Sequence, residues 1–482
     1  MTIKEKTIGW NFDNSYSNLP KSFIYEISPV PVKSPELVIL NYNLADQMGL
    51  NFSNTGDEEL ARMFSGNLLP KGSKSIAQAY AGHQFGHFTM LGDGRAVLIG
   101  EHISKNNQRL DIQFKGSGQT PFSRNGDGRA ALGPMLREYL ISEAMYSLNI
   151  PTTRSLVVVK TGEKVIREKP LQGAILTRVA SSHIRVGTFQ FIRTRENLNE
   201  LNALIDYTIT RHYPKISKSK NKAYDLLNVL IDKQIELVVN WMRVGFIHGV
   251  MNTDNMAISG ETIDYGPCAF MDSYNLGTCF SSIDHMGRYA YGNQPAITKW
   301  NLARFAECLL TFISPKKDDA LKMATELIDK FDKIYEEKWL NMMKNKLGLI
   351  GDDKEDNVLI FELLEIMKKQ KLDYTNTFLF LMDHEIDNDK NYQNEEFSDW
   401  KMKWQKRLTK DSKNLMELNN PVIIPRNHNV ENVLKAAENN DLTPFKDLLQ
   451  ALKNPYTNQK ILTKYQSLPP KSDEKYQTFC GT

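Results

Sequence analysis

The chain has 482 residues, of which 41% are hydrophobic and 24% charged, and its formal net charge is +3. This composition is typical of a soluble globular protein and excludes disordered, fibrous and membrane classes. The balanced charge gives no electrostatic basis for binding nucleic acid, and no apolar run approaches the roughly 18 residues of a membrane span. We therefore expect a monomeric, cytoplasmic protein with no membrane or nucleic-acid partner.

The sequence changes character along the chain. Short β-rich runs alternate with glycine-rich turns through about residue 159, and later stretches show helical periodicity, for example at Leu327, Phe331 and Ile334. We expect an α+β protein with a smaller, mixed β-rich lobe followed by a larger, mainly helical lobe. The expected parts are an N-terminal extension (1–75), the β-rich lobe (76–170), the helical lobe with the catalytic segment (171–310) and a helical C-terminal extension (311–482).

A glycine-rich turn precedes a predicted strand. Gly92 and Gly94 flank Asp93, and Arg95 leads directly into the apolar run 96–99. Glycines at these positions would let backbone amides approach a phosphate closely. The same pattern is also typical of an ordinary hairpin turn, so the turn alone is weak evidence for nucleotide binding.

A lysine and a glutamate follow at informative positions. The strand predicted over 110–115 places its apolar residues on the core face, so that Lys115 points away from the core. A helix predicted to open at Gly133 carries Glu138 beside its apolar stripe. Protein kinases use the order glycine loop, strand lysine, helix glutamate, in which the lysine holds the α- and β-phosphates and the glutamate fixes the lysine. The alternative for either residue alone is a solvated surface side chain.

Two further segments suit a polyphosphate. The loop 116–129 is too rich in glycine and polar residues to be a core element, and we interpret it as a second nucleotide-facing loop. Arg178 and Arg185 lie seven residues apart after an apolar run, and paired guanidinium groups bind phosphates well. Partners in surface salt bridges are the alternative for these two arginines.

The segment 248–266 carries the strongest pattern in the chain. His248, Asn255 and Asp264 fit the spacing of a kinase-like catalytic loop followed by its metal-binding Asp-x-Gly. Val250 stands where a kinase has its substrate-activating aspartate, and a valine cannot accept a proton. Asp254 is the nearby carboxylate that could act as the base instead. Asn255 and Asp264 offer hard oxygen ligands for Mg²⁺ or Mn²⁺.

The cysteines favour a reducing compartment. Cys268, Cys279, Cys308 and Cys480 are too sparse and too irregularly spaced for a disulfide framework or a zinc site. Cys480 belongs to the last residues of the sequence, where a thiol contributes little to a core, so we regard it as a redox candidate.

Taken together, these motifs resemble the selenoprotein O family over nearly the whole chain. The resemblance implies a protein-kinase-like bilobal fold that holds ATP in a flipped pose and transfers AMP to Ser, Thr or Tyr of a protein. The matching segments are Tyr80-Ala81-Gly82-His83-Gln84-Phe85-Gly86, the Gly92 turn, Lys115 with residues 123–129, residues 248–266, Asn420-Pro421 and Pro425-Arg426-Asn427-His428.

The resemblance also implies roles for individual residues. Asp254 would accept the proton of the acceptor hydroxyl, Asn255 and Asp264 would hold the metal, and Glu138 would pair with Lys115. Cys480 would form a regulatory disulfide with Cys279. The implied ATP contacts are Gly92, Gly94, Arg95, Lys115, Asp127, Gly128, Arg178, Arg185 and Asp264.

Two other functions fit parts of the pattern. A kinase-like phosphotransferase shares the spacing from His248 to Asn255, although Val250 argues against it. A catalytically inactive nucleotide-binding scaffold would keep Lys115 and lose the metal ligands, yet Asn255 and Asp264 are both present. UTP in place of ATP, which would make the protein a uridylyltransferase, is the alternative nucleotide.

Overall fold

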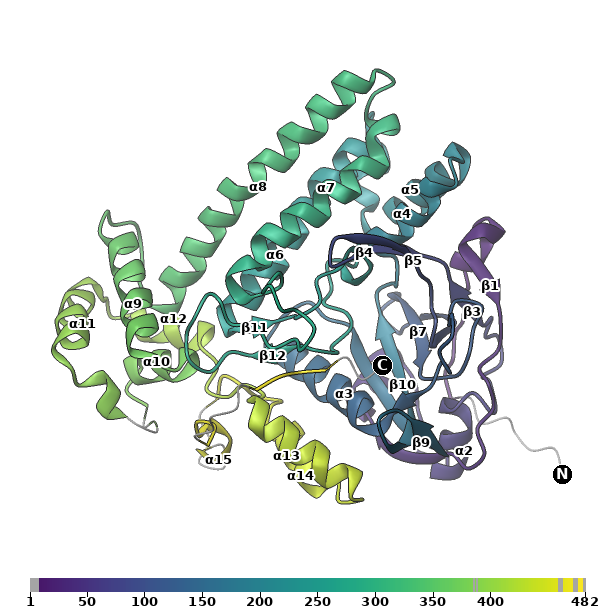
Figure 1. The fold of residues 1–482 in the computed structure, drawn as a ribbon, viewed down its shortest axis with the longest axis horizontal. Coiled ribbons are helices and arrows are strands. Elements are labelled where there is room, and N and C mark those ends of the chain that lie inside the picture. Colours follow the sequence, from purple (N-terminus) through teal and green to yellow (C-terminus); the bar gives the residue numbers. More distant parts are fainter. Residues whose placement is uncertain (1–7, 385, 387–388, 458–462, 471–475, 480–482) are drawn as a thin grey trace.

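The computed structural model describes residues 8–384, 386, 389–457, 463–470 and 476–479, which form a mixed α+β protein (Figure 1). The larger sheet is antiparallel, in the order β1-β3-β6-β7-β10-β9-β2, and β8 pairs with β10. Its strands are β1 (Ile24–Glu26), β2 (Glu36–Leu40), β3 (Ile76–Gln78), β6 (Ala96–Ile103), β7 (Arg109–Lys115), β8 (Ala130–Ala131), β9 (Arg154–Ile166) and β10 (Pro170–Ala180).

This sheet unites segments that are distant in the sequence. β1 and β2 come from the region expected to be an N-terminal extension, yet they pair with β3 and β9 inside the same sheet. β10 crosses the boundary expected at residue 170 and continues to Ala180. Strands from residue 24 to residue 180 therefore share one antiparallel framework, beside which lie the short helices α1 (Tyr42–Met48) and α2 (Asp57–Phe64).

The side chains of strand β7 alternate between an apolar and a polar face of the sheet. Ile112 and Phe114 are buried in an apolar cluster on one face of the sheet, as the sequence predicts. Lys115 lies on the opposite face but is only 5% exposed, because that face is covered as well. Lys115 points away from the apolar core, as expected. Its side chain is nevertheless buried, because it lies in a polar layer between the sheet and the helices.

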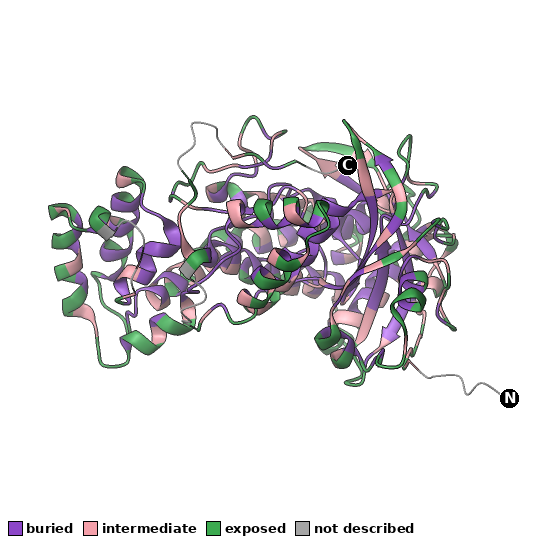
Figure 2. Cartoon of the chain, turned by 90° about the horizontal axis from the view of Figure 1, so that it is seen from below, coloured by how far each residue is buried: buried purple, intermediate pink, exposed green. Residues whose placement is uncertain are grey.

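Helix α3 (Leu132–Ser147) packs against β9 and β10 and is buried along most of its length. Figure 2 shows that buried residues fill the interior of the molecule, with exposed residues along its outer edges. Leu136 and Leu140 are fully buried, and burial of one such side chain contributes roughly 1.5–3 kcal/mol. α13 (Asn427–Glu438) and α14 (Thr443–Ala451) pack on α3 from the other side. A helix enclosed in this way can hold Glu138 away from water.

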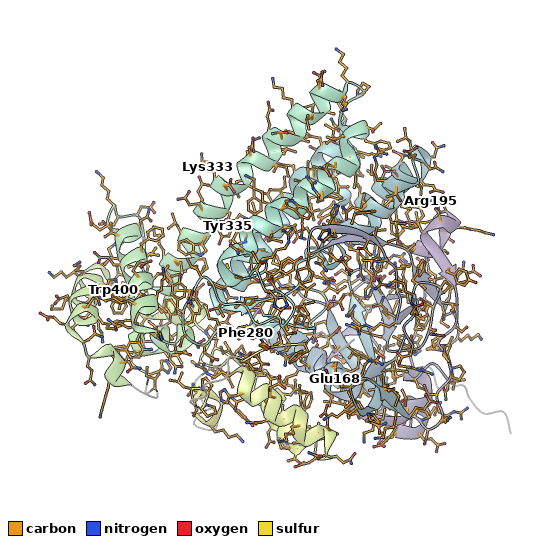
Figure 3. All side chains as sticks on the ribbon, in the orientation of Figure 1. Glu168, Arg195, Phe280, Lys333, Tyr335 and Trp400 are labelled. Carbon is orange, nitrogen blue, oxygen red and sulfur yellow. The ribbon has the colours of Figure 1, made fainter. Side chains whose placement is uncertain are left out.

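The remaining helices form the larger part of the molecule. α6 (Lys222–Val244) packs against α7 (Gln294–Ile313) and α8 (Lys317–Lys346). The predicted stripe lies on α8, where Leu327 and Phe331 are buried and Tyr335 is half-buried (Figure 3). The other helices are α4 (Val186–Thr194), α5 (Leu198–His212), α9 (Asp356–Gln370), α10 (Tyr374–Leu381), α11 (Glu395–Arg407), α12 (Ser412–Asn419) and α15 (Thr463–Gln466).

Helices α9 to α12 gather at the end of the molecule opposite the sheet (Figure 1). Trp400, labelled in Figure 3, is buried there, and its indole N–H donates to the Leu359 carbonyl at 2.9 Å. Its ring stacks on that of Trp404 with 5.9 Å between ring centroids. Among the described residues, no helix combines the length and the apolar character that a membrane span requires.

Candidate active site

A cavity of about 350 Å³ lies between the sheet and the helical part of the chain. Its size falls within the roughly 300–1,000 Å³ of small-molecule sites. Basic side chains outnumber acidic ones in its lining, seven to four, which suits a polyanionic ligand. The lining includes every residue implied to contact ATP, metal or acceptor: Gly92, Gly94, Arg95, Lys115, Asp127, Gly128, Arg178, Arg185, Asp254, Asn255 and Asp264.

Two cations and two carboxylates form the inner wall of this cavity. Lys115 Nζ lies 2.6 Å from Glu138 Oε2 and 2.6 Å from Asp264 Oδ1. Arg178, on β10, donates from Nε to Glu138 Oε1 at 2.8 Å and from Nη2 to Asp264 Oδ1 at 2.6 Å. Each cation thus bridges both carboxylates, and such pairing offsets the cost of burying the charges. The structure brings together the strand lysine and the helix glutamate that the sequence singled out.

The same network decides the ionisation of its acids. Burial by itself would raise the pKa of the Glu138 carboxyl, but Arg178 and Lys115 hold this pKa below its ordinary value. Burial also acts to raise the pKa of Asp264, and the same two cations with Arg185 bring it well below the ordinary value. Both groups are therefore carboxylates at neutral pH. An anionic Asp264 facing the cavity is suited to bind a divalent cation.

The chain conformation around Asp264 is unusual. This residue has a φ of +64°, in the left-handed region that non-glycine residues rarely adopt. Such conformations cluster at functional sites, where the surrounding structure maintains them. His248 lies close behind, because one of its ring nitrogens, Nε2, is 2.9 Å from the carbonyl oxygen of Ile263. The histidine of the predicted catalytic loop thus braces the residue before Asp264 and does not enter the cavity lining.

Asp254 occupies a short helical turn, η4 (Thr253–Asn255), and is 7% exposed. Its Oδ1 is buried without a hydrogen-bond partner, and its backbone carbonyl accepts from Arg185 Nη1 at 3.0 Å. Burial raises the pKa of the Asp254 carboxyl to about 6, which suits a general base near neutral pH. Val250 lines the same cavity and contributes no acid or base. Of Val250 and Asp254, only Asp254 has a side chain that can accept a proton.

The glycine turn is held against the second loop. A Cβ on Gly92, whose φ is +146°, would lie 2.3 Å from the Phe122 side chain, and one on Gly94 would lie 2.8 Å from the Phe122 carbonyl oxygen. Thr120 Oγ1 donates to the Asp93 carbonyl at 2.6 Å. Close packing on Phe122 is therefore a second reason for glycine here, besides the approach to phosphate that the sequence predicts.

Asn255 and Asp264 both line the cavity, and their oxygens fit a hard divalent cation. Asn255 Nδ2 donates to the Val250 carbonyl at 3.0 Å, which leaves the amide oxygen as the acceptor. No group of three or more His, Cys, Asp or Glu side chains arranged for a metal occurs in the described part of the chain. Asn255 and Asp264 are therefore the side chains of the lining that could hold such an ion.

The structure adds residues that the sequence did not single out. Arg167, in the turn between β9 and β10, lines the cavity and donates to Asp127 at 2.9 and 3.2 Å. The Arg185 guanidinium lies over the ring of Tyr80, 4.3 Å from its centroid. Tyr80 could have been identified from the sequence, because it begins one of the segments that resemble the family. Arg167 belongs to no such motif, and only the pairing of β9 with β10 shows that it lies at the cavity.

The hairpin of β4 (Ala81–Gln84) and β5 (His87–Met90) packs on the segment 248–266, at η4. The backbone N–H of His83 donates to Thr253 Oγ1 at 2.7 Å, and that hydroxyl donates to Gln190 Oε1 at 2.6 Å. Gln190 Nε2 in turn lies 2.8 Å from His83 Nδ1. This closed set of hydrogen bonds gives a physical role to the sequence signature that begins at Tyr80, since it fixes the residue before Asp254.

Of the two cysteines predicted to be redox-active, the structure describes one. Cys279 is half-buried, and its Sγ lies 3.4 Å from Asp284 Oδ2. Cys480 lies outside the described residues. Their disulfide stays a prediction from the sequence.

Comparisons with known proteins show similarity over nearly the whole chain. The model of the family described as "Protein adenylyltransferase SelO" matches residues 6–453. A protein of Pelagibacter ubique named "Protein nucleotidyltransferase YdiU" is 66% identical over 99% of this chain and all of its own length. Proteins of the same name from Nitrosococcus oceani and Bacillus thuringiensis are each 55% identical over at least 99% of both chains. Matches of this extent, together with a cavity that gathers the residues implied to contact ATP and metal, place the chain in the protein adenylyltransferase SelO family.

Proposed function

We propose that this chain binds ATP with Mg²⁺ or Mn²⁺ on a protein-kinase-like bilobal framework and transfers AMP to Ser, Thr or Tyr hydroxyls of other proteins. The observation that carries the proposal is the position of Asp254. Its buried carboxyl lines the same cavity as the Lys115–Asp264 pair, while Val250 stands where a kinase base would be. A carboxylate with a pKa of about 6 is available to activate an acceptor.

The chemistry follows from these side chains. The acceptor oxygen attacks the α-phosphorus of ATP as its proton passes to Asp254, and the bond from the α-phosphorus to the bridging oxygen breaks. Pyrophosphate leaves, and its charge suits the guanidinium groups of Arg178 and Arg185. Asn255 and Asp264 would hold the metal, which supplies charge neutralisation on the phosphates when bound. Lys115, fixed by Glu138, positions a phosphate.

The division into lobes supports the kinase-like framework. The strand lysine, the helix glutamate and the metal-binding aspartate meet at the junction of the sheet and the helices, as the kinase order requires. In this proposal the first lobe is the sheet up to Ala180, including β1 and β2 from the range 1–75. The remainder of the expected range 171–310 is the second lobe, and 311–482 is an extension. The proposed pairing of Cys279 with Cys480 would link activity to redox state.

The test uses purified protein, a divalent metal and a protein mixture, with ATP labelled at the α- or at the γ-phosphate. The expected result is protein labelling from the α-position alone, lost in Asp264→Asn and in Asp254→Asn. Labelling from the γ-position would instead establish a phosphotransferase, and ATP binding without labelling would establish a scaffold. UTP labelled at its α-phosphate, run in parallel, identifies a uridylyltransferase.

A further inference from the structure

Two segments meet at Asn252, two residues before the proposed base. The backbone N–H of Phe85, at the tip of the β4–β5 hairpin, donates to Asn252 Oδ1 at 3.2 Å. The hydroxyl of Tyr289 donates to the same oxygen at 2.7 Å, and the rings of Phe85 and Tyr289 lie 5.1 Å apart. The hairpin and the segment 284–289 therefore form one continuous wall beside Asp254.

The outer side of this wall exposes large apolar side chains. Phe88, on β5, is 44% exposed and Met286 is 92% exposed. The His83 ring lies 5.2 Å from that of Phe88 and 5.2 Å from that of Trp300, on α7, edge-on to both. Exposed Phe and Met next to a tryptophan are typical of surfaces that bind other proteins.

An arginine without an acidic partner lies at the centre of the same surface. Arg288 Cζ lies 4.9 Å from the centroid of the Trp300 ring and would lie 3.9 Å from a Cβ on Gly86. No carboxylate among the described residues is within salt-bridge distance of this guanidinium, and its Nε is buried without a hydrogen-bond partner. The nearby Asp284 instead accepts from the backbone N–H groups of Arg288 and Tyr289, at 2.9 and 2.8 Å. The guanidinium has the Tyr289 side chain as a hydrogen-bond partner, and no acid of the described residues neutralises its charge.

We propose that Phe88, Met286, Arg288 and Trp300, the acceptor rim, bind the segment of the acceptor protein that presents its hydroxyl to Asp254. The occupant is a peptide segment with an apolar side chain, which contacts Phe88 and Met286, and a carboxylate, which pairs with Arg288. The proposal rests on the proposed function and names its substrate class. The wall places the rim beside the base, and the positive charge of Arg288, which has no acidic partner among the described residues, sets the complementary charge of the peptide.

The test compares four fluorescent peptides that share a central serine. Their flanks are apolar and acidic, apolar alone, acidic alone, or apolar and basic. Binding is read by fluorescence anisotropy with Mg²⁺ and an ATP analogue whose α–β bridge is a methylene, and transfer is read with α-labelled ATP. The variants are Phe88→Ser, Met286→Ser and Arg288→Gln. Leu418→Ser is the matched control, because Leu418 is 74% exposed on α12, outside the rim.

The apolar–acidic peptide should bind best to the wild type, and losing the Phe88 contact should weaken its binding about tenfold. Arg288→Gln should remove the preference for the acidic flank, and Leu418→Ser should change nothing. Equal binding of all four peptides to the wild type, or equal binding to wild type and rim variants, overturns the proposal. Selective binding without α-label transfer would retain the rim and reject the proposed function, so the two failures are distinguishable.

Discussion

The Asp254 carboxylate lies directly against the α-carbon of Gly82. A Cβ built on Gly82 would come within 2.3 Å of Asp254 Oδ1, a distance that real structures do not tolerate. The β4–β5 hairpin therefore positions the proposed base in two ways. It forms hydrogen bonds to the segment 248–266, and Gly82 directly contacts the Asp254 carboxylate. Glycine at this position leaves room for the carboxylate.

We predict that Gly82→Ala displaces Asp254 and slows AMP transfer about 100-fold, because errors of roughly 1 Å at reacting groups have effects of this size. ATP affinity should change little, since Gly82 is not part of the cavity lining. Gly56→Ala is the control, because a Cβ on Gly56 would meet nothing within 4 Å. Transfer rates and ATP dissociation constants of both variants check the prediction, and a normal rate for Gly82→Ala would contradict it.

The pKa of Asp254 predicts the pH profile of the reaction. Burial raises this pKa to about 6, and the carboxyl must be ionised to accept the acceptor proton. AMP transfer should therefore rise with pH and level off above about pH 6. Single-turnover rates at saturating ATP and metal test this. A rate independent of pH from 5 to 8, measured on protein that remains folded, would exclude Asp254 as the base.

The same shift has a consequence for stability. The folded-state pKa of about 6 lies above the ordinary 3.8, so ionising Asp254 destabilises the fold as pH rises through this range. Asp254→Asn should then raise the free energy of unfolding at pH 8 by up to roughly 3 kcal/mol, with no gain below pH 4. Urea unfolding at both pH values measures the difference. A gain of equal size at the two pH values would point to another cause.

Glu138→Gln tests the buried charge network. The substitution leaves Lys115 and Arg178 with Asp264 as their remaining carboxylate, so we expect a loss of stability of about 3–5 kcal/mol and weaker ATP binding. Glu143→Gln, on the same helix, removes an ion pair with Arg154 of 2.7 Å outside the cavity lining. Thermal unfolding and ATP titrations on both variants separate the effects, and unchanged ATP affinity in Glu138→Gln would refute the role of the pair.

The ion pair between Arg167 and Asp127 allows a test of whether Arg167, which the sequence did not single out, contributes to ATP binding. Arg167→Gln and Asp127→Asn should each weaken ATP binding, and the double variant should weaken it by less than the sum of both. Because both side chains are partly exposed, the coupling should be about 0.2–1 kcal/mol. Arg195→Gln, which breaks a pair with Glu200 away from the cavity (Figure 3), is the control. Strict additivity in ATP titrations would show that the two residues act independently.

Several residues of the candidate site could be predicted from the sequence alone. Lys115, Glu138, Asp254 and Asp264 could be chosen from residue type and order, because glycine turns, strand alternation and helix periodicity act over a few residues. The same local patterns located β6, β7 and α3 and the helical character of the later chain. The absence of an acid at Val250 could also be read directly.

How these groups come together could be seen only in the folded structure. Pairing of β10 with β7 brings Arg178 beside Gln113 and so close to the network of Lys115 and Glu138. Sequence periodicity could not predict that the polar face of β7 is buried, because burial depends on the helices that cover it. It also could not reveal Arg167 or the contact of Gly82 with Asp254. Both depend on chain segments that are far apart in sequence and become neighbours only when the core is packed.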